Sequence, residues 1–235
     1  MIASPGEIAV APRFELLNAQ DHGALRMQFP RVTRLHFVQI IGSEFSAAAA
    51  CCPVLLTKDA TTGDFYAGAM FGFKPDECLL PTAGDRGGFE PLNLQREGFF
   101  TTGEQIAIDR GHPRFAGAGE ALFDESQPSA HLRQMQRVLG QLQTGIEKTQ
   151  AFIRTLRELN LIEAIEVSMN FDDGERLTLQ GLYTVSMDSL HALSDAQAIK
   201  LFRHGDLQRI YAMNGSLSQI AVLADRRNRL LTRSA

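Results

Sequence analysis

The sequence has no tryptophan and only three cysteines in 235 residues. Cys51, Cys52 and Cys78 are too few for a disulfide framework, and adjacent Cys51 and Cys52 could bridge only through a strained ring. The paired C-x-x-C or histidine-containing spacings of structural zinc sites are also missing. We therefore expect three free thiols that pack as small apolar side chains beside a strand, and we expect no metal and no other cofactor.

The sequence also lacks long apolar runs and an excess of positive charge. No stretch approaches the roughly 18 apolar residues of a spanning helix, and the N-terminus has no basic segment followed by an apolar one. The formal charge of −4 gives no broad cationic field for phosphate backbones. We expect a cytoplasmic protein without a membrane span and without a nucleic-acid partner.

Complete catalytic motifs are missing as well. There is no P-loop, the glycines near residue 117 lack the third glycine of a dinucleotide loop, and no serine lies in a G-x-S-x-G pattern. His204 and Asp206 have the H-x-D spacing of the facial triad of iron oxygenases, but no histidine follows Asp206. We interpret Gly205 as the end of one helix and Asp206 as the N-cap of the last.

One small cluster remains as a candidate for catalysis. Asp109, His112 and Arg114 follow a predicted strand, where a carboxylate, an imidazole and a guanidinium could form an acid/base site or hold an anion. His112 precedes Pro113, which favours an extended connection, and polar residues at strand ends are usually part of loops. The loop interpretation is the stronger one, so an enzyme remains the alternative reading.

What the sequence does contain predicts an α+β fold. At 44% hydrophobic residues the chain has enough apolar material for a sizeable core. We expect antiparallel β-hairpins that form a sheet packed against one long amphipathic helix, with short helices at the C-terminal end. The predicted order is an extended N-terminal arm (1–30) and then a single α+β domain (31–235) with a β-rich part (31–115), a long helix (128–160), a hairpin (164–186) and short helices (188–230).

The first hairpin occupies residues 53–77. Two apolar runs flank a turn at residues 59–64 that is rich in Asp, Thr and Gly. Aromatic side chains follow the turn and recur near residue 100, and they could line an apolar pocket or a peptide-binding groove, although core packing explains them too. The predicted binding residues are Phe65, Tyr66, Phe71, Phe73, Phe99 and Phe100.

Local signals also support the other elements. Apolar residues recur at helical spacing over residues 128–160, where Gly140 and Gly145 allow either a kink or a break. Strict alternation on both sides of an Asp-Asp-Gly turn at residues 172–174 predicts the second hairpin. Asp188 is expected to cap one C-terminal helix, and a Ser-x-x-Gln capping box at residues 194–197 begins the next.

Several segments, in this order, resemble the SapC-like family. They are LNAQDHGALRM (17–27), LHFVQI (35–40), VLLTKDATTGDFYAGAMFGF (54–73), EALFDESQPS (120–129), LTLQGLYTVSMDSLHALSDAQ (177–197) and HGDLQRIYAMNGSLSQI (204–220). The family takes its name from a surface-layer gene group, and its members are often encoded beside flavin-dependent halogenases and outer-membrane receptors. The resemblance implies a bacterial, cytoplasmic protein with no established reaction and no catalytic residues to transfer.

Three classes of function follow from these observations. A non-catalytic accessory protein that recruits a peptide or protein partner comes first, because aromatic strands are present and complete catalytic motifs are not. An enzyme with an acid/base or metal site of an unrecognised kind comes second. A surface-layer or secretion-related factor comes third. The sequence leaves the oligomeric state open.

Overall fold

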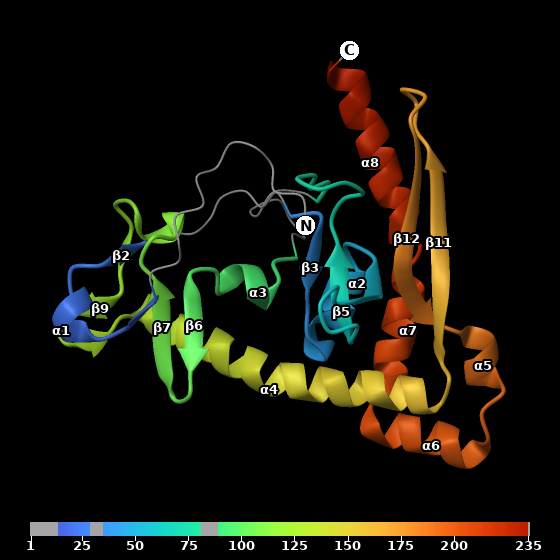
Figure 1. The fold of residues 1–235 in the computed structure, drawn as a ribbon, viewed down its shortest axis with the longest axis horizontal. Coiled ribbons are helices and arrows are strands. Elements are labelled where there is room, and N and C mark those ends of the chain that lie inside the picture. Colours follow the sequence, from blue (N-terminus) through green and yellow to red (C-terminus); the bar gives the residue numbers. More distant parts are fainter. Residues whose placement is uncertain (1–13, 29–34, 81–88, 235) are drawn as a thin grey trace. The chain divides into compact units, whose positions relative to one another are not determined.

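The computed structural model describes residues 14–28, 35–80 and 89–234. Its residues cluster into two compact units (Figure 1), one formed by Met1–Pro30 with Gln95–Gln141 and the other by Arg31–Leu94 with Leu142–Ala235. We call them unit 1 and unit 2. Whether they unfold together, as a single domain after an N-terminal arm, stays a prediction.

The predicted α+β class is confirmed, because the chain forms antiparallel sheets together with helices, one of them long. The strands are β1 (Phe14–Leu16), β2 (Arg26–Met27), β3 (Phe37–Gln39), β4 (Val54–Lys58), β5 (Phe65–Met70), β6 (Phe99–Thr102), β7 (Gln105–Asp109), β8 (Glu120–Ala121), β9 (Phe123–Asp124), β10 (Gln127–Pro128), β11 (Ile162–Asn170) and β12 (Arg176–Val185). The α-helices are α1 (Ala19–His22), α2 (Phe45–Ala49), α3 (Leu92–Gln95), α4 (Ala130–Glu158), α5 (Met187–His191), α6 (Asp195–His204), α7 (Asp206–Ser216) and α8 (Gln219–Ser234), and two 3₁₀ turns span Gly42–Glu44 and Pro113–Phe115.

Unit 1 is built on a three-stranded antiparallel sheet with the order β1-β7-β6. Strand β1 lies within the predicted arm and pairs with β7. Strands β6 and β7 lie in the β-rich part predicted for residues 31–115 and are joined by a tight turn in which Gly103 has a φ of 60°. The segment between β7 and α4 contains the three short strands β8, β9 and β10. Strand β8 pairs with β2, and β9 pairs with β10.

Unit 2 contains a five-stranded antiparallel sheet with the order β11-β12-β4-β5-β3. Both predicted hairpins are part of it, as β4-β5 and β11-β12. In the first turn Asp59 Oδ1 accepts the main-chain N–H groups of Thr61 and Thr62, and Gly63 adopts a φ of 74°. These local bonds explain why the turn could be recognised from its residue types.

The two faces of this sheet are covered by different helices. On β4, Val54 and Leu56 point to the first face, where they join a core with residues of α2, α4, α6 and α7. Leu55 points to the second face and packs with Met70 of β5 and Leu223 of α8. Figure 1 shows α8 running along the β11-β12 hairpin. The alternation of side chains along a strand produces this division.

The long helix α4 is continuous through both glycines, so neither a break nor two shorter helices occur. Gly145 lies against Ile41, and a Cβ at this position would overlap the Ile41 side chain. Thr149, one turn further on, accepts the Gly42 N–H at 2.8 Å through its hydroxyl. Close approach of α4 to the 3₁₀ turn therefore explains a glycine that helix propensity alone would disfavour.

The C-terminal helices confirm one predicted cap and correct two others. Ser194 N–H donates to Gln197 Oε1 at 3.0 Å in the expected capping box. The cap of α5 is Ser186, whose hydroxyl accepts from Ser189, so the prediction for Asp188 is wrong. Asp206 is the first residue of α7 rather than its N-cap, because Gly205, with a φ of 74°, ends α6 and also precedes α7. In addition, the single last helix expected from the sequence is two, α7 and α8.

Within the described residues, no helix combines the length and the apolar character needed to cross a membrane.

Candidate binding pocket

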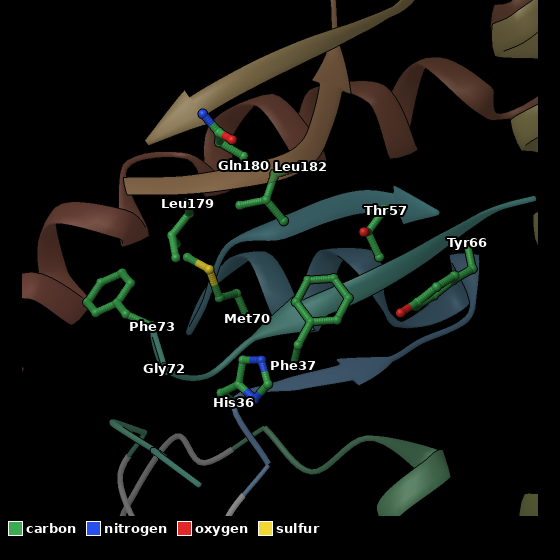
Figure 2. A pocket seen from close by; sticks show the side chains of 10 residues that line it. All are labelled: His36, Phe37, Thr57, Tyr66, Met70, Gly72, Phe73, Leu179, Gln180 and Leu182. Atoms are coloured by element: carbon green, nitrogen blue, oxygen red, sulfur yellow. The ribbon is translucent and has the colours of Figure 1, made fainter. Parts of the chain in front are cut away.

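The second face of the unit 2 sheet carries an open pocket of about 330 Å³. Figure 2 shows side chains from four strands and their connections converging on it. It is lined by His36, Phe37, Thr57, Tyr66, Met70, Gly72, Phe73, Leu179, Gln180 and Leu182. Strands β3, β4, β5 and β12 therefore all contribute, which places the pocket on a rigid scaffold.

Phe37 forms one wall because the neighbouring strand carries a glycine. Residue Gln39 of β3 pairs with Gly68 of β5, and the Phe37 ring lies over Gly68 so closely that a Cβ there would overlap it. The ring also makes an edge-to-face contact with Tyr66, with 6.2 Å between the centroids. Gly68 thus lets one aromatic ring lie flat on the sheet beside another.

The floor and the opposite wall are apolar. Met70 and Phe73 are 2% and 4% exposed and belong to the core of the second face, so they are held firmly. Leu179 and Leu182 of β12 are half-buried and pack against the same core. The wall and floor keep their shape through core packing and do not depend on an occupant.

Four polar side chains, none of them Asp, Glu, Lys or Arg, complete the lining. Thr57 Oγ1 donates to the Gly181 main-chain oxygen at 3.0 Å, which ties β4 to β12. Gln180 Nε2 donates to Glu166 Oε2 at 3.1 Å. Burial raises the pKa of the Tyr66 hydroxyl, and the negative charge of Asp59 raises it further. The pocket therefore combines apolar walls with hydrogen-bonding groups and disfavours an added negative charge.

Of the aromatic residues proposed from the sequence, Tyr66 and Phe73 line this pocket. Phe65 points to the first face, where its ring meets Tyr183 edge-on at 4.9 Å and Lys58 lies 5.0 Å above it. Phe71 is 1% exposed in the core of that face. The structure thus divides the aromatic return strand between a pocket and a core.

Phe99 and Phe100 belong to unit 1 and point to opposite faces of its sheet. Phe99 is fully buried and packs edge-on against Phe115 at 5.2 Å. Phe100 is half-buried and makes an edge contact with Phe14 at 5.0 Å. Phe99 has the surroundings of a core residue, whereas Phe100 is part of a surface aromatic pair.

The candidate acid/base cluster forms the connection after β7. Asp109 Oδ1 accepts the Gly111 N–H at 3.0 Å, and His112 Nδ1 accepts the Arg114 N–H at 3.2 Å. Arg114 is buried, donates to the Gln95 main-chain oxygen at 2.5 Å and lies over the ring of Phe99. The structure brings the three residues into one turn: Asp109 and His112 hold its backbone, and Arg114 ties it to Gln95.

The pKa of the His112 imidazole lies below its usual range. Burial lowers the pKa of His112, the nearby Glu97 opposes this shift, and Arg114 adds to it. Since Nδ1 accepts a main-chain N–H, the neutral ring carries its proton on Nε2. This is the arrangement of a capping histidine at the start of the 3₁₀ turn Pro113–Phe115.

His204 and Asp206, which have the H-x-D spacing, lie close together where α6 ends and α7 begins. The His204 Nδ1 to Asp206 Oδ2 distance is 4.0 Å, while Asp206 Oδ1 accepts from Arg209 at 2.7 Å. Across the described parts of the chain, no group of three or more His, Cys, Asp or Glu residues is arranged to hold a metal ion. Cys51, Cys52 and Cys78 form no disulfide among the described residues.

Sequence reasoning missed eight of the ten lining residues, among them the apolar Phe37, Met70, Leu179 and Leu182. A signal for Met70 was available, because alternation along β5 puts Tyr66 and Met70 on one face and Phe65 on the other. The contribution of β12 could not be read in this way. Its neighbour β4 lies more than a hundred residues earlier in the chain, and a single register pair, Tyr183 with Leu56, connects them.

Comparison with known proteins gives one match. The model of the SapC family matches residues 17–223 of the chain. Neither the curated proteins nor the solved structures provide a match.

Proposed function

The chain belongs to the SapC family, and we propose that it is a non-catalytic accessory protein that recruits a peptide or protein partner. The binding site of this proposal is the pocket on the second face of the unit 2 sheet. The observation that carries the proposal is that rings and apolar side chains of β3, β5 and β12, together with Thr57 of β4, line an open hollow of about 330 Å³. A preformed apolar pocket with a few polar groups is the usual form of a binding site.

The packing of the sheet supports a recognition role. The first face is covered by helices, whereas the described part of the second face is covered by α8 and retains a hollow beyond it. Phe37 lies on the edge strand β3, and its half-exposed ring depends on the absence of a side chain at Gly68. A residue that served only the core would gain nothing from this accessible position.

The enzyme alternative has less support. Asp109 and His112 bind main-chain groups of their own turn, Arg114 binds the Gln95 main-chain oxygen, and none of the three side chains lines the pocket. An acid/base site needs a carboxylate or imidazole beside the reacting group. His36 is the titratable imidazole in the pocket lining, and it has no carboxylate among the lining residues.

The proposal includes a setting for the partner. A flavin-dependent halogenase is one candidate protein, because the family resemblance associates such enzymes with SapC-like genes. The cytoplasm is the proposed location, and the absence of a disulfide among the described cysteines fits a reducing compartment. Nucleic acid is left out because the chain carries a formal charge of −4.

A selection from a random peptide library displayed on phage tests the proposal. The full chain is the bait, and each enriched peptide is measured again on Phe37→Ala and Tyr66→Ala, which remove the two aromatic walls. Phe202→Ala is the matched control, because Phe202 lies on α6 and is 72% exposed outside the pocket. Thermal melting verifies that each variant is folded.

We expect enriched peptides that lose about tenfold or more in affinity on both pocket variants and bind the Phe202→Ala control like the parent, since buried aromatic anchors dominate binding energy. Peptides that bind all variants equally would refute the pocket as the site. A selection that enriches no peptide would refute peptide recruitment.

A further inference from the structure

We infer that the occupant of the pocket is an uncharged aromatic side chain presented by the partner peptide. This inference rests on the proposed function and adds the chemistry of the anchor residue. Three properties of the pocket lead to it: the arrangement of its rings, the absence of charge in its lining and the position of its polar groups.

The rings favour a third aromatic group. Phe37 and Tyr66 stand edge-to-face with an interplanar angle of 76°, so they present a ring face and a ring edge to the same hollow. A further ring can therefore adopt an offset or edge-on contact with either of them. Met70 on the floor adds a thioether, which favours contact with an aromatic edge.

The size of the pocket fits one side chain rather than a large ligand. Its volume of about 330 Å³ is at the lower end of the range of small-molecule sites. The pocket is also open to solvent, which leaves an exit for the peptide backbone to which the anchor belongs. An aromatic residue gives the largest buried apolar area in such a volume.

The charges argue against an ionic anchor. None of the ten lining residues is Asp, Glu, Lys or Arg. A charged side chain would lose hydration on entry without gaining a carboxylate, ammonium or guanidinium partner among the lining residues, which is unfavourable. The raised pKa of Tyr66 agrees with this, because it reports an environment that opposes negative charge.

The polar groups sit where the backbone of a peptide would leave the pocket. Figure 2 shows Gln180 and His36 on opposite sides of the apolar centre, with Thr57 and the Tyr66 hydroxyl at one end. Thr57 already donates to Gly181, which leaves its oxygen to accept a bond. Neutral donors and acceptors of this kind satisfy the main-chain groups on either side of an apolar anchor.

The experiment replaces the anchor within one pocket-dependent peptide from the selection. Its variants carry Trp, Tyr, Phe, Leu, Glu or Lys at the anchor position and are otherwise identical. Because the protein has no tryptophan, the indole emission of the Trp peptide reports its transfer into the pocket without background. Isothermal titration gives the affinities of all six peptides.

Gly68→Ala is the variant that closes the pocket. The new Cβ would overlap the Phe37 ring and force it off the sheet, into the space of the ligand. Gly140→Ala is the matched control, since a Cβ at Gly140 meets no atom within 4 Å. Phe37→Ala serves as a second variant in case Gly68→Ala does not fold.

We expect the aromatic peptides to bind about tenfold more tightly than the Leu peptide, and the Glu and Lys peptides to bind about thirtyfold more weakly than the aromatic ones. Gly68→Ala should abolish the blue shift of the indole emission, and Gly140→Ala should retain it. Pocket-dependent peptides whose anchor is aliphatic or charged would overturn the inference and leave the proposed function standing. If no peptide depends on the pocket, the proposed function fails, and the inference fails with it.

Discussion

Replacement of Arg227 by methionine should destabilise unit 2 by about 1–3 kcal/mol, because it breaks a network that ties three segments together. Arg227 lies on α8 and is 6% exposed. Its Nε donates to Glu77 at 3.0 Å, and its Nη2 donates to Glu175 at 2.6 Å. Glu77 follows β5 and Glu175 precedes β12, so a single guanidinium connects both hairpins to the helix.

The magnitude follows from what the substitution leaves behind. Removal of one member of a buried ion pair costs about 3–5 kcal/mol when the remaining charge cannot be hydrated. Here the side chains of Glu77 and Glu175 are 20% and 31% exposed, and Glu175 retains Lys74, so the cost should be smaller. The Arg227 guanidinium also lies 4.0 Å above the Phe171 ring, a contact that methionine replaces in part.

A second property of Arg227 limits the gain that the intact network can provide. Its Nη1 is buried and has no hydrogen-bond partner among the described residues. An unpaired buried donor reduces the net stabilisation, so the loss should stay below that of a fully satisfied ion pair. Arg227→Ala should cost about 1–2 kcal/mol more than Arg227→Met, because it also removes the packing of the aliphatic stem.

Tyrosine fluorescence during unfolding in urea is the appropriate measurement. The chain has three tyrosines, Tyr66, Tyr183 and Tyr211, and all of them belong to unit 2. The signal therefore reports the unfolding of the unit that contains Arg227. A free energy fitted to it describes this unit and does not average over both units. A loss below about 0.5 kcal/mol for Arg227→Ala would contradict the role of the network.

The pH dependence provides an independent control. Hydrogen bonds from Lys74 and Arg227 hold the pKa of Glu175 below its usual range. A carboxylate whose pKa is lowered by folding stabilises the folded state at pH values above its unfolded pKa. This stabilisation is lost as the pH falls through the pKa of the folded state. The difference in unfolding free energy between the parent and Arg227→Met should therefore become smaller in acid. A difference that becomes larger there would contradict the ion pair between Arg227 and Glu175.

Three further predictions concern the packing of unit 2 and α4. Burial raises the pKa of Glu44, so the parent should lose stability as the pH rises through that raised value, whereas Glu44→Gln should lack this slope in urea titrations at several pH values. Gly145→Ala should lower the melting temperature measured by circular dichroism, because the new Cβ would overlap Ile41. Gly140→Ala should instead stabilise α4 by up to about 1 kcal/mol. A change of stability in the same direction for both variants would contradict the close approach of Gly145 to Ile41. His204→Ala should leave the melting temperature within about 1–2 °C of the parent with and without added iron, and a stabilisation by iron that this variant abolishes would contradict the structural role of His204.

The elements that could be predicted are those whose signals are local. The turn at residues 59–64 is recognisable because Asp59 binds the N–H groups two and three residues on, and such bonds form irrespective of the rest of the fold. The capping box of Ser194 and Gln197 is equally local. Asp188 and Asp206 show the limit of this reasoning, because an aspartate in the first helical turn is favourable without being the cap.

The arrangement of the sheet could not be predicted, because it depends on contacts between distant segments. Nothing in the sequence of β4 indicates that β12 will lie beside it rather than another strand. The pocket inherits this difficulty, since Leu179 and Leu182 come from β12 while Tyr66 and Met70 come from β5. Aromatic residues close in sequence, such as Phe65 and Tyr66, were predicted as one surface and in fact point to opposite faces.

The pocket exists because the helices cover the two faces of the sheet unequally. On the first face, residues of α2, α4, α6 and α7 join one core, so little of that face could serve for recognition. On the second face, α8 packs over Leu55 and Met70 through Leu223, and Phe37 reaches the remaining surface from the edge strand. Met70 therefore belongs to both the core and the pocket. Substitutions at Met70 would therefore change stability and binding together. A substitution at Gly68 acts on the pocket through Phe37, so position 68 is better suited to separate an effect on binding from an effect on stability.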